Sequence, residues 1–229
     1  MLKNLSLFKY LLIISCIVFL SCGCASKKAK PGLTHAELLN KGLEMIKKGN
    51  PSNAITILQM LKDRYPYTES AIIAGLKLGD TYFTLDEYET AYDLYDEFEK
   101  LHPKDVNIPY VKYQKAMCYF NQIKSFDRQQ TYVLRARKEF EGLIMLYPDN
   151  EYTVMARRNL RRCLKYLTQF EITTANFYFN QEKYKAALLR YTYAVNNFPD
   201  IGQYHEALEK IAICKARIAE SGEDTVTEQ

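Results

Sequence analysis

The chain has 229 residues, of which 25% are charged and 48% hydrophobic, and its formal net charge is +4. These fractions are typical of a folded domain and exclude disorder over most of the chain. The small net charge does not favour nucleic acid as a partner.

The first predicted element is a secretory signal. Two lysines and no acid precede an apolar run of eleven residues, 10–20, which is shorter than the ~18–20 residues that a membrane-spanning helix needs. Small residues and two cysteines follow it, in the pattern of a bacterial lipoprotein signal. We therefore expect a signal peptide at 1–23 and a lipidated tether at 24–33. Cys24 is the expected lipidation site, Cys22 is the alternative, and an ordinary signal peptide with incidental cysteines is the third interpretation.

Four repeats follow the signal. Each ends at a proline and has an alanine twelve residues before that proline; the pairs are Ala54 and Pro66, Ala91 and Pro103, Ala136 and Pro148, and Ala187 and Pro199. A small residue stands a further twelve residues back in three repeats, as Gly42, Gly79 and Ala175. In the third repeat its equivalent, Ala116, lies eight residues further away, which indicates an insertion around 124–130.

These spacings predict an all-α fold. Small residues allow two antiparallel helices to cross closely, and a proline ends the second helix. The pattern is that of tetratricopeptide-type helical hairpins, which form an α-solenoid array. We expect about nine helices in one domain, at 34–220.

The end of the array departs from a regular repeat. Residues 151–182 contain neither glycine nor proline, and their apolar residues recur at helical spacing, which predicts one long helix bridging the third and fourth hairpins. A last helix from about 203 to 219 is expected to cover the open end. The residues expected on it are His205, Leu208, Ile211, Ala212 and Lys215. A disordered tail is expected at 221–229.

The sequence contains no motif for catalysis. The histidines stand at no metal-ligand spacing, and there is no glycine-rich phosphate loop and no nucleophile or zinc motif. We therefore expect no enzyme activity, no cofactor and no metal. Free buried thiols are expected at Cys118, Cys163 and Cys214, with a disulfide as the alternative. The acidic residues between 86 and 99 are interpreted mostly as a solvated helix face.

A basic cluster lies in the long predicted helix. Its members are Arg157, Arg158, Arg161, Arg162 and Lys165. Like charges four residues apart lower the stability of a helix, so the cluster needs an explanation. Two remain open: it meets acidic neighbours from an adjacent helix, or it faces a partner.

Several longer segments, together with the lipoprotein signal, resemble the BamD family, the outer-membrane protein assembly factor lipoproteins. The segments are RYP (64–66), HPKDVNIPYVKY (102–113), FDRQQT (126–131), ARKEFEGLIMLYPDNEY (136–152) and FEITTANFYFNQEKYKAALLRY (170–191). The resemblance implies a scaffold of the β-barrel assembly machinery, lipid-anchored at the periplasmic face of the outer membrane. Such a scaffold assists the folding and insertion of β-barrel proteins. The alternative is a tetratricopeptide pilot lipoprotein for a secretin or another envelope complex.

The resemblance also implies partners and binding residues. The C-terminal repeats would bind the POTRA domains of the barrel-forming subunit, and other accessory lipoproteins would join the complex. The residues assigned to partner binding are Arg190, Arg128 and Asp127. Unfolded β-barrel clients would bind near the N-terminal repeats, at Arg64, Tyr65 and Tyr67. Longer members of the family end with one more helix.

Arg190 can also be placed from its repeat register. It stands three residues after Ala187, so its side chain is expected at the edge of the groove with a free guanidinium. The alternative is an intramolecular ion pair with Glu171 or Glu182.

Overall fold

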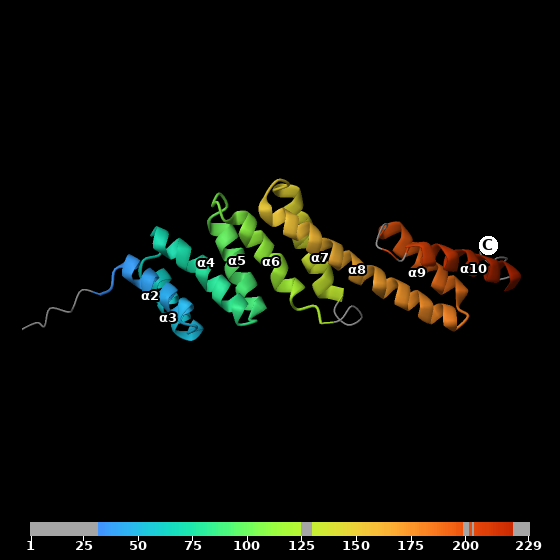
Figure 1. Cartoon of the computed structure of the whole chain (residues 1–229), viewed down its shortest axis with the longest axis horizontal. Helices are drawn as coiled ribbons and strands as arrows, with labels where there is room; N and C mark the ends of the chain where they lie inside the picture. The colour runs from blue at the N-terminus through green and yellow to red at the C-terminus, as the bar shows by residue number, and fades with distance from the viewer. Residues whose placement is uncertain (1–31, 125–129, 199–201, 203, 222–229) are drawn as a thin grey trace, which may run out of the picture. The chain divides into compact units, whose positions relative to one another are not determined.

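The computed structural model describes residues 32–124, 130–198, 202 and 204–221, and every regular element in these ranges is an α-helix (Figure 1). The helices are α2 (His35–Lys47), α3 (Pro51–Arg64), α4 (Glu69–Thr84), α5 (Tyr88–Leu101), α6 (Ile108–Phe120), α7 (Gln130–Leu146), α8 (Glu151–Asn180), α9 (Tyr184–Asn197) and α10 (Tyr204–Ser221). These nine helices of the described ranges confirm the predicted all-α array. No helix among the described residues is both long and apolar enough to span a membrane.

Several predictions fall on other parts of the chain. The signal peptide, both candidate lipidation sites Cys24 and Cys22, the predicted partner residues Asp127 and Arg128, and the tail after residue 221 lie outside the described residues.

Consecutive helices pack against one another along the array (Figure 1). Four hairpins are formed by α2 with α3, α4 with α5, α6 with α7, and α8 with α9, and α10 packs on α9. The buried side chains form four clusters, and each cluster draws mainly on three consecutive helices. Since α4, α6 and α8 each contribute to two clusters, every hairpin is stabilised by its neighbours.

Each hairpin closes around the small residues that the repeat predicts. The four repeat alanines are fully buried. A Cβ on Gly42 of α2 would lie 2.6 Å from Cδ2 of Leu58, and a Cβ on Gly79 of α4 would lie 2.8 Å from Cε1 of Tyr95. Leu58 and Tyr95 each stand four residues after a repeat alanine. The glycines therefore make room for one large side chain from the second helix of the hairpin.

The turn inside a hairpin contains one residue with positive φ. This residue is Gly49 (69°) in the first hairpin, Asp86 (60°) in the second and Glu182 (60°) in the fourth, always five residues before the repeat alanine. A left-handed backbone is less favourable by ~1–2 kcal/mol for a residue with a Cβ than for glycine. The left-handed turn residue therefore lowers the stability of the second and fourth hairpins, whereas the first hairpin has glycine at this position.

Helix α8 is the long bridging helix and has 30 residues. It ends at Asn180, two residues before the predicted end, and Glu182 in the following turn has the left-handed backbone. Its first half packs with α6 and α7 through Cys163, and its second half packs with α9 and α10 through Ala175. One continuous helix therefore belongs to two hydrophobic clusters.

The register of α10 differs in part from the prediction. Of the expected residues, Ile211 packs against the buried cluster that α10 forms with α8 and α9. The structure buries Ala207, Cys214 and Ile218, whereas Leu208 is exposed. Ala207 belongs to the same buried cluster as Ala194 of α9. Small side chains, rather than the larger leucine, therefore set this helix contact.

Candidate docking sites

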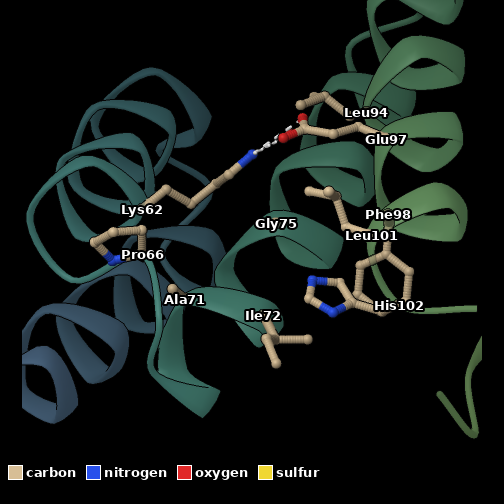
Figure 2. A pocket seen from close by; sticks show the side chains of 10 residues that line it. All are labelled: Lys62, Pro66, Ala71, Ile72, Gly75, Leu94, Glu97, Phe98, Leu101 and His102. Carbon is tan, nitrogen blue, oxygen red and sulfur yellow. Dashed lines mark hydrogen bonds and ion pairs between the residues drawn. The ribbon is translucent and has the colours of Figure 1, made fainter. Parts of the chain in front are cut away.

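The first candidate site is a pocket between the end of α3, α4 and α5 (Figure 2). Its volume is about 140 Å³. Ile72 of α4 lies opposite the side chains of Phe98 of α5 and of His102, which follows α5 (Figure 2). The rings of Phe98 and His102 meet edge to face, with their centroids 5.2 Å apart. The walls of the pocket are therefore mainly apolar and aromatic.

A single ion pair crosses the rim of this pocket. Lys62 Nζ of α3 donates to Glu97 Oε2 of α5 at 3.2 Å (Figure 2). Gly75 of α4 lies between these helices, and a Cβ there would make an ordinary 3.9 Å contact with the Lys62 side chain. An apolar cavity of about 150 Å³ can hold one benzene ring. The pocket is therefore large enough for one aromatic or branched side chain.

The three residues predicted to bind clients lie in different environments. Arg64 is exposed at the end of α3. Tyr65 follows it, and its ring lies edge-on to His35 with centroids 6.0 Å apart. Tyr67 is fully exposed, at 100% of its surface. Pro66 lines the pocket, and the three predicted residues lie beside it rather than in its walls.

A helix cap fixes the loop that carries Pro66 and Tyr67. Thr68 Oγ1 accepts a hydrogen bond from the Ala71 N–H at 3.2 Å and donates one to the Tyr65 carbonyl at 2.9 Å. Thr68 thereby caps α4 and closes the turn from α3. The exposed ring of Tyr67 is thus attached to a defined turn next to the pocket.

The second candidate site is the ion pair of Arg190 on α9 with Glu171 on α8. Arg190 Nη1 lies 3.1 Å from Glu171 Oε2, so the expectation of a free guanidinium is corrected in favour of the intramolecular alternative. The antiparallel hairpin brings these positions face to face. Glu171 is buried, with 8% of its surface exposed, whereas 42% of the Arg190 side chain remains exposed. One face of the guanidinium is therefore still open to a partner.

Most acidic residues of this face are exposed, as predicted, but Asp96 and Glu99 of α5 are partly buried. Lys115 of α6 is only 6% exposed, and its Nζ lies 2.6 Å from Asp96 and 3.0 Å from Glu99. Burial alone would raise the pKa of Asp96, but hydrogen bonds from Lys100 and Lys115 outweigh burial and lower that pKa. In Glu99, hydrogen bonds from Lys112 and Lys115 likewise outweigh burial and lower its pKa. This network holds α5 to α6.

The basic cluster of α8 has no acidic neighbour in the described part of the chain. All five of its cations are exposed, and none forms an ion pair with a described carboxylate. The guanidinium of Arg162 lies 4.7 Å from the centre of the Phe120 ring. The sequence left two explanations open. The described residues do not support the one that requires acidic neighbours from an adjacent helix.

Neither a metal centre nor an exposed thiol occurs among the described residues. No group of three or more metal-ligating side chains occurs among them. The three cysteines of the helices are free and buried, as predicted. Burial raises the pKa of Cys118 and of Cys163 to about 12, so both thiols stay protonated at neutral pH. The array of packed helical hairpins defines a helical-repeat scaffold, and its candidate sites are docking surfaces.

Comparison with known proteins gives the family. The chain belongs to the family described as YfiO, outer membrane lipoprotein, which matches residues 31–226. Curated relatives in Caulobacter vibrioides, Rickettsia prowazekii and Vibrio cholerae carry the name outer membrane protein assembly factor BamD. The predicted resemblance to BamD lipoproteins is therefore confirmed. Because the family consists of assembly factors, the prediction that the chain is not an enzyme is confirmed as well.

These relatives are distant but cover most of the chain. The Caulobacter protein is 26% identical over 82% of this chain and 64% of its own length. The Rickettsia protein is 25% identical over 91% of this chain and 83% of its own length. The Vibrio protein is 24% identical over 82% of this chain and 82% of its own length. A solved tetratricopeptide repeat protein from Parabacteroides merdae is 13% identical, covers 81% of this chain and 78% of its own, and has a TM-score of 0.43. At that score the likeness supports no statement on function.

Proposed function

We propose that this chain is an assembly factor of the β-barrel assembly machinery that holds an unfolded client and the barrel-forming subunit on one helical scaffold. Its family of outer membrane lipoproteins and the name of its relatives support the proposal. The observation that carries it is the presence of two separate surfaces suited to polypeptides, the pocket at α4 and α5 and Arg190 at α9. Other accessory lipoproteins are part of the proposed complex.

The client is proposed to bind in an extended conformation over α4 and α5. Successive side chains of a strand point to opposite sides, and the strands of an outer-membrane barrel alternate apolar and polar residues with aromatic residues near both ends. One aromatic side chain can therefore enter the pocket while its neighbours point away. The exposed ring of Tyr67 offers a second apolar contact beside it.

Filling the pocket tests this proposal. Gly75→Leu should occupy the pocket, because the position adjoins it and a Cβ fits there without a clash. We expect about tenfold weaker binding of a peptide with alternating apolar residues and a terminal phenylalanine, measured by fluorescence anisotropy. Gly142→Leu on α7 is the matched control, because a Cβ there meets nothing within 4 Å. Equal binding by both variants and the wild type would exclude the pocket as the client site.

The barrel-forming subunit is proposed to contact Arg190 with a carboxylate. The guanidinium has five donors and uses only one side for Glu171, so a partner can bind without breaking the internal pair. In the unbound chain Glu171 holds the guanidinium in position, which lowers the entropy lost on binding.

A variant that tests this contact has to keep a positive charge beside the buried Glu171 or remove the charge of Glu171 itself. Arg190→Glu is unsuitable, because it would place a second carboxylate beside the buried Glu171. Arg190→Lys keeps the positive charge but loses the planar pair of donors that binds a carboxylate through two hydrogen bonds, so it should weaken association. Glu171→Gln keeps a hydrogen-bond acceptor beside the guanidinium but removes the charge that holds it in position, so it should weaken association less than Arg190→Lys does.

Pull-down of the barrel-forming subunit from detergent-solubilised envelopes measures both effects, with circular dichroism as the check on folding. Unchanged association in Arg190→Lys would exclude the contact. Co-purification of a secretin in place of the barrel-forming subunit would favour the alternative function of a pilot lipoprotein.

A further inference from the structure

The basic cluster of α8 forms two parallel rows on the helix. Arg157, Arg161 and Lys165 follow one another at intervals of four residues, and Arg158 and Arg162 form the adjacent row. Four residues of α-helix rise by ~6 Å, so each row presents cations at about that spacing. All five side chains are exposed.

This arrangement lowers the stability of the helix that carries it. Like charges at i and i+4 repel each other, and no carboxylate in the described ranges lies within ion-pair distance to offset them. Burial of α8 in two hydrophobic clusters keeps the helix intact despite the repulsion. Apart from the contact of Arg162 with the Phe120 ring, the cations have no stabilising partner among the described residues, which favours contact with another molecule as their role.

The composition of the cluster bears on what that molecule is. The chain has 21 lysines and ten arginines, yet four of the arginines fall within the six residues 157–162. A guanidinium binds carboxylates through two parallel hydrogen bonds, and arginine and methionine are enriched in protein interfaces while lysine is depleted. Anionic lipid surfaces attract lysine and arginine alike. Exposed Val154 and Met155 precede the rows on the same helix and add an apolar edge.

We infer that this face of α8 docks an acidic amphipathic segment of a partner protein, with carboxylates about 6 Å apart and an apolar residue that meets Val154 or Met155. A helix with glutamates at i and i+4, or a strand with acids at alternate positions, has this spacing. The inference does not depend on the proposed client pocket or on Arg190, because neither lies in these rows.

A matched pair of variants of the full chain tests the inference. The first is Arg157→Ala/Arg161→Ala/Lys165→Ala, which removes one row. The second is Lys41→Ala/Lys47→Ala/Lys104→Ala, which removes the same charge from exposed positions elsewhere. The probes are a synthetic helical peptide of about five turns with glutamate at every fourth position, a permuted peptide of the same composition, and vesicles containing anionic phosphatidylglycerol.

We expect the spaced peptide to bind the first variant about tenfold more weakly than the wild type, and the control variant within about twofold of it. The permuted peptide should bind the wild type more weakly than the spaced one. The melting temperature of the first variant should be unchanged or higher, since a repulsive row has been removed.

Three results would overturn the inference. Equal losses in the two variants would show that only net charge matters. Loss of vesicle binding in the first variant, with peptide binding intact, would assign the face to lipid. A lower melting temperature of the first variant would show that the cations support the fold.

Discussion

The hairpin of α4 and α5 and the hairpin of α8 and α9 place a tyrosine at the same repeat position but give its hydroxyl different acceptors. Tyr95 donates to Asp80 at 2.9 Å, and Tyr191 donates to Asn176. Each acceptor follows the small residue of the first helix by one position. Asp80 also accepts a hydrogen bond at 2.6 Å from Tyr110 of α6, in the next hairpin.

The difference shows that one scaffold can fix one repeat by buried polar contacts (the closed region) and leave a charged side chain accessible in another (the open region). The charged acceptor in the second hairpin connects three helices, and the Lys115 network connects α5 to α6 again. Burial and then the Asp80 charge raise the pKa of Tyr95, so its hydroxyl keeps its proton and remains a donor. In the fourth hairpin the acceptor is a neutral amide, and the charged residue Arg190 stays half exposed.

The largest effect is expected from removing the buried cation of the closed region. Lys115→Met would leave Asp96 and Glu99 together without their shared counter-ion, and we expect the free energy of unfolding to fall by about 3 kcal/mol. Arg190→Met combined with Glu171→Gln removes the ion pair of the fourth hairpin without leaving a buried charge, and it should cost about 1 kcal/mol, because the arginine is partly solvated. Urea unfolding measures both. Equal losses would contradict the contrast between the two hairpins.

A second test concerns the close crossing in the α4–α5 hairpin. Gly79→Ala places a Cβ 2.8 Å from Tyr95, whose hydroxyl is fixed by Asp80, so the ring cannot easily move away. We expect a loss of about 2 kcal/mol in the free energy of unfolding. Gly142→Ala is the control, with open space around the new Cβ, and should raise stability by up to about 1 kcal/mol. An unchanged melting temperature of Gly79→Ala would refute the predicted crossing.

A smaller effect should appear as pH dependence. The pKa values of Asp96 and Glu99 are lowered in the folded chain, so the unfolded chain takes up protons first as the pH falls. Their contribution is present above the unfolded pKa values of about 4 and is lost as the pH falls through the lower folded values. Urea unfolding between pH 6 and about pH 3 should show this loss in the wild type and a smaller one in Lys115→Met. Parallel pH profiles would show that Lys115 does not set the shift.

The smallest effect is expected in the hairpin turns. Glu182→Gly removes a Cβ from a left-handed residue at φ 60° and should raise the free energy of unfolding by about 0.5–1 kcal/mol. Asp86→Gly should gain less, because Asp86 also accepts a hydrogen bond from Tyr88. Thermal unfolding of the two variants compares them, and a larger gain for Asp86→Gly would contradict this account.

The helical hairpins could be predicted because their spacing reflects steric needs within a few turns of chain. Gly79, Ala91 and Pro103 specify a close crossing and an ending without reference to distant residues. The long helix could be predicted in the same way, since residues 151–182 lack both helix-breaking residue types. The helix ends at Asn180, inside the predicted range, and the left-handed Glu182 belongs to the turn that follows it.

Features that depend on neighbouring helices could not be predicted in this way. The face of α10 that packs on α9 is the one with Ala207, which shares a buried cluster with Ala194, and the periodicity alone also allowed the adjacent face with Leu208. The buried position of Lys115 depends on two acids of another helix. The α5 wall of the pocket was missed because the acidic residues of this segment dominated the interpretation, although the sequence also has the apolar Leu94, Phe98 and Leu101 at helical spacing there.

The continuity of α8 has a mechanical consequence. A helix of 30 residues is ~45 Å long, and no proline interrupts it. A rotation of about 5° around its first turn therefore displaces its far end by ~4 Å. Because one end lies in the cluster with α6 and α7 and the other in the cluster with α9 and α10, a partner that tilts the last hairpin applies torque to the third one. Helix α8 therefore transmits a rotation of one hairpin directly to the other.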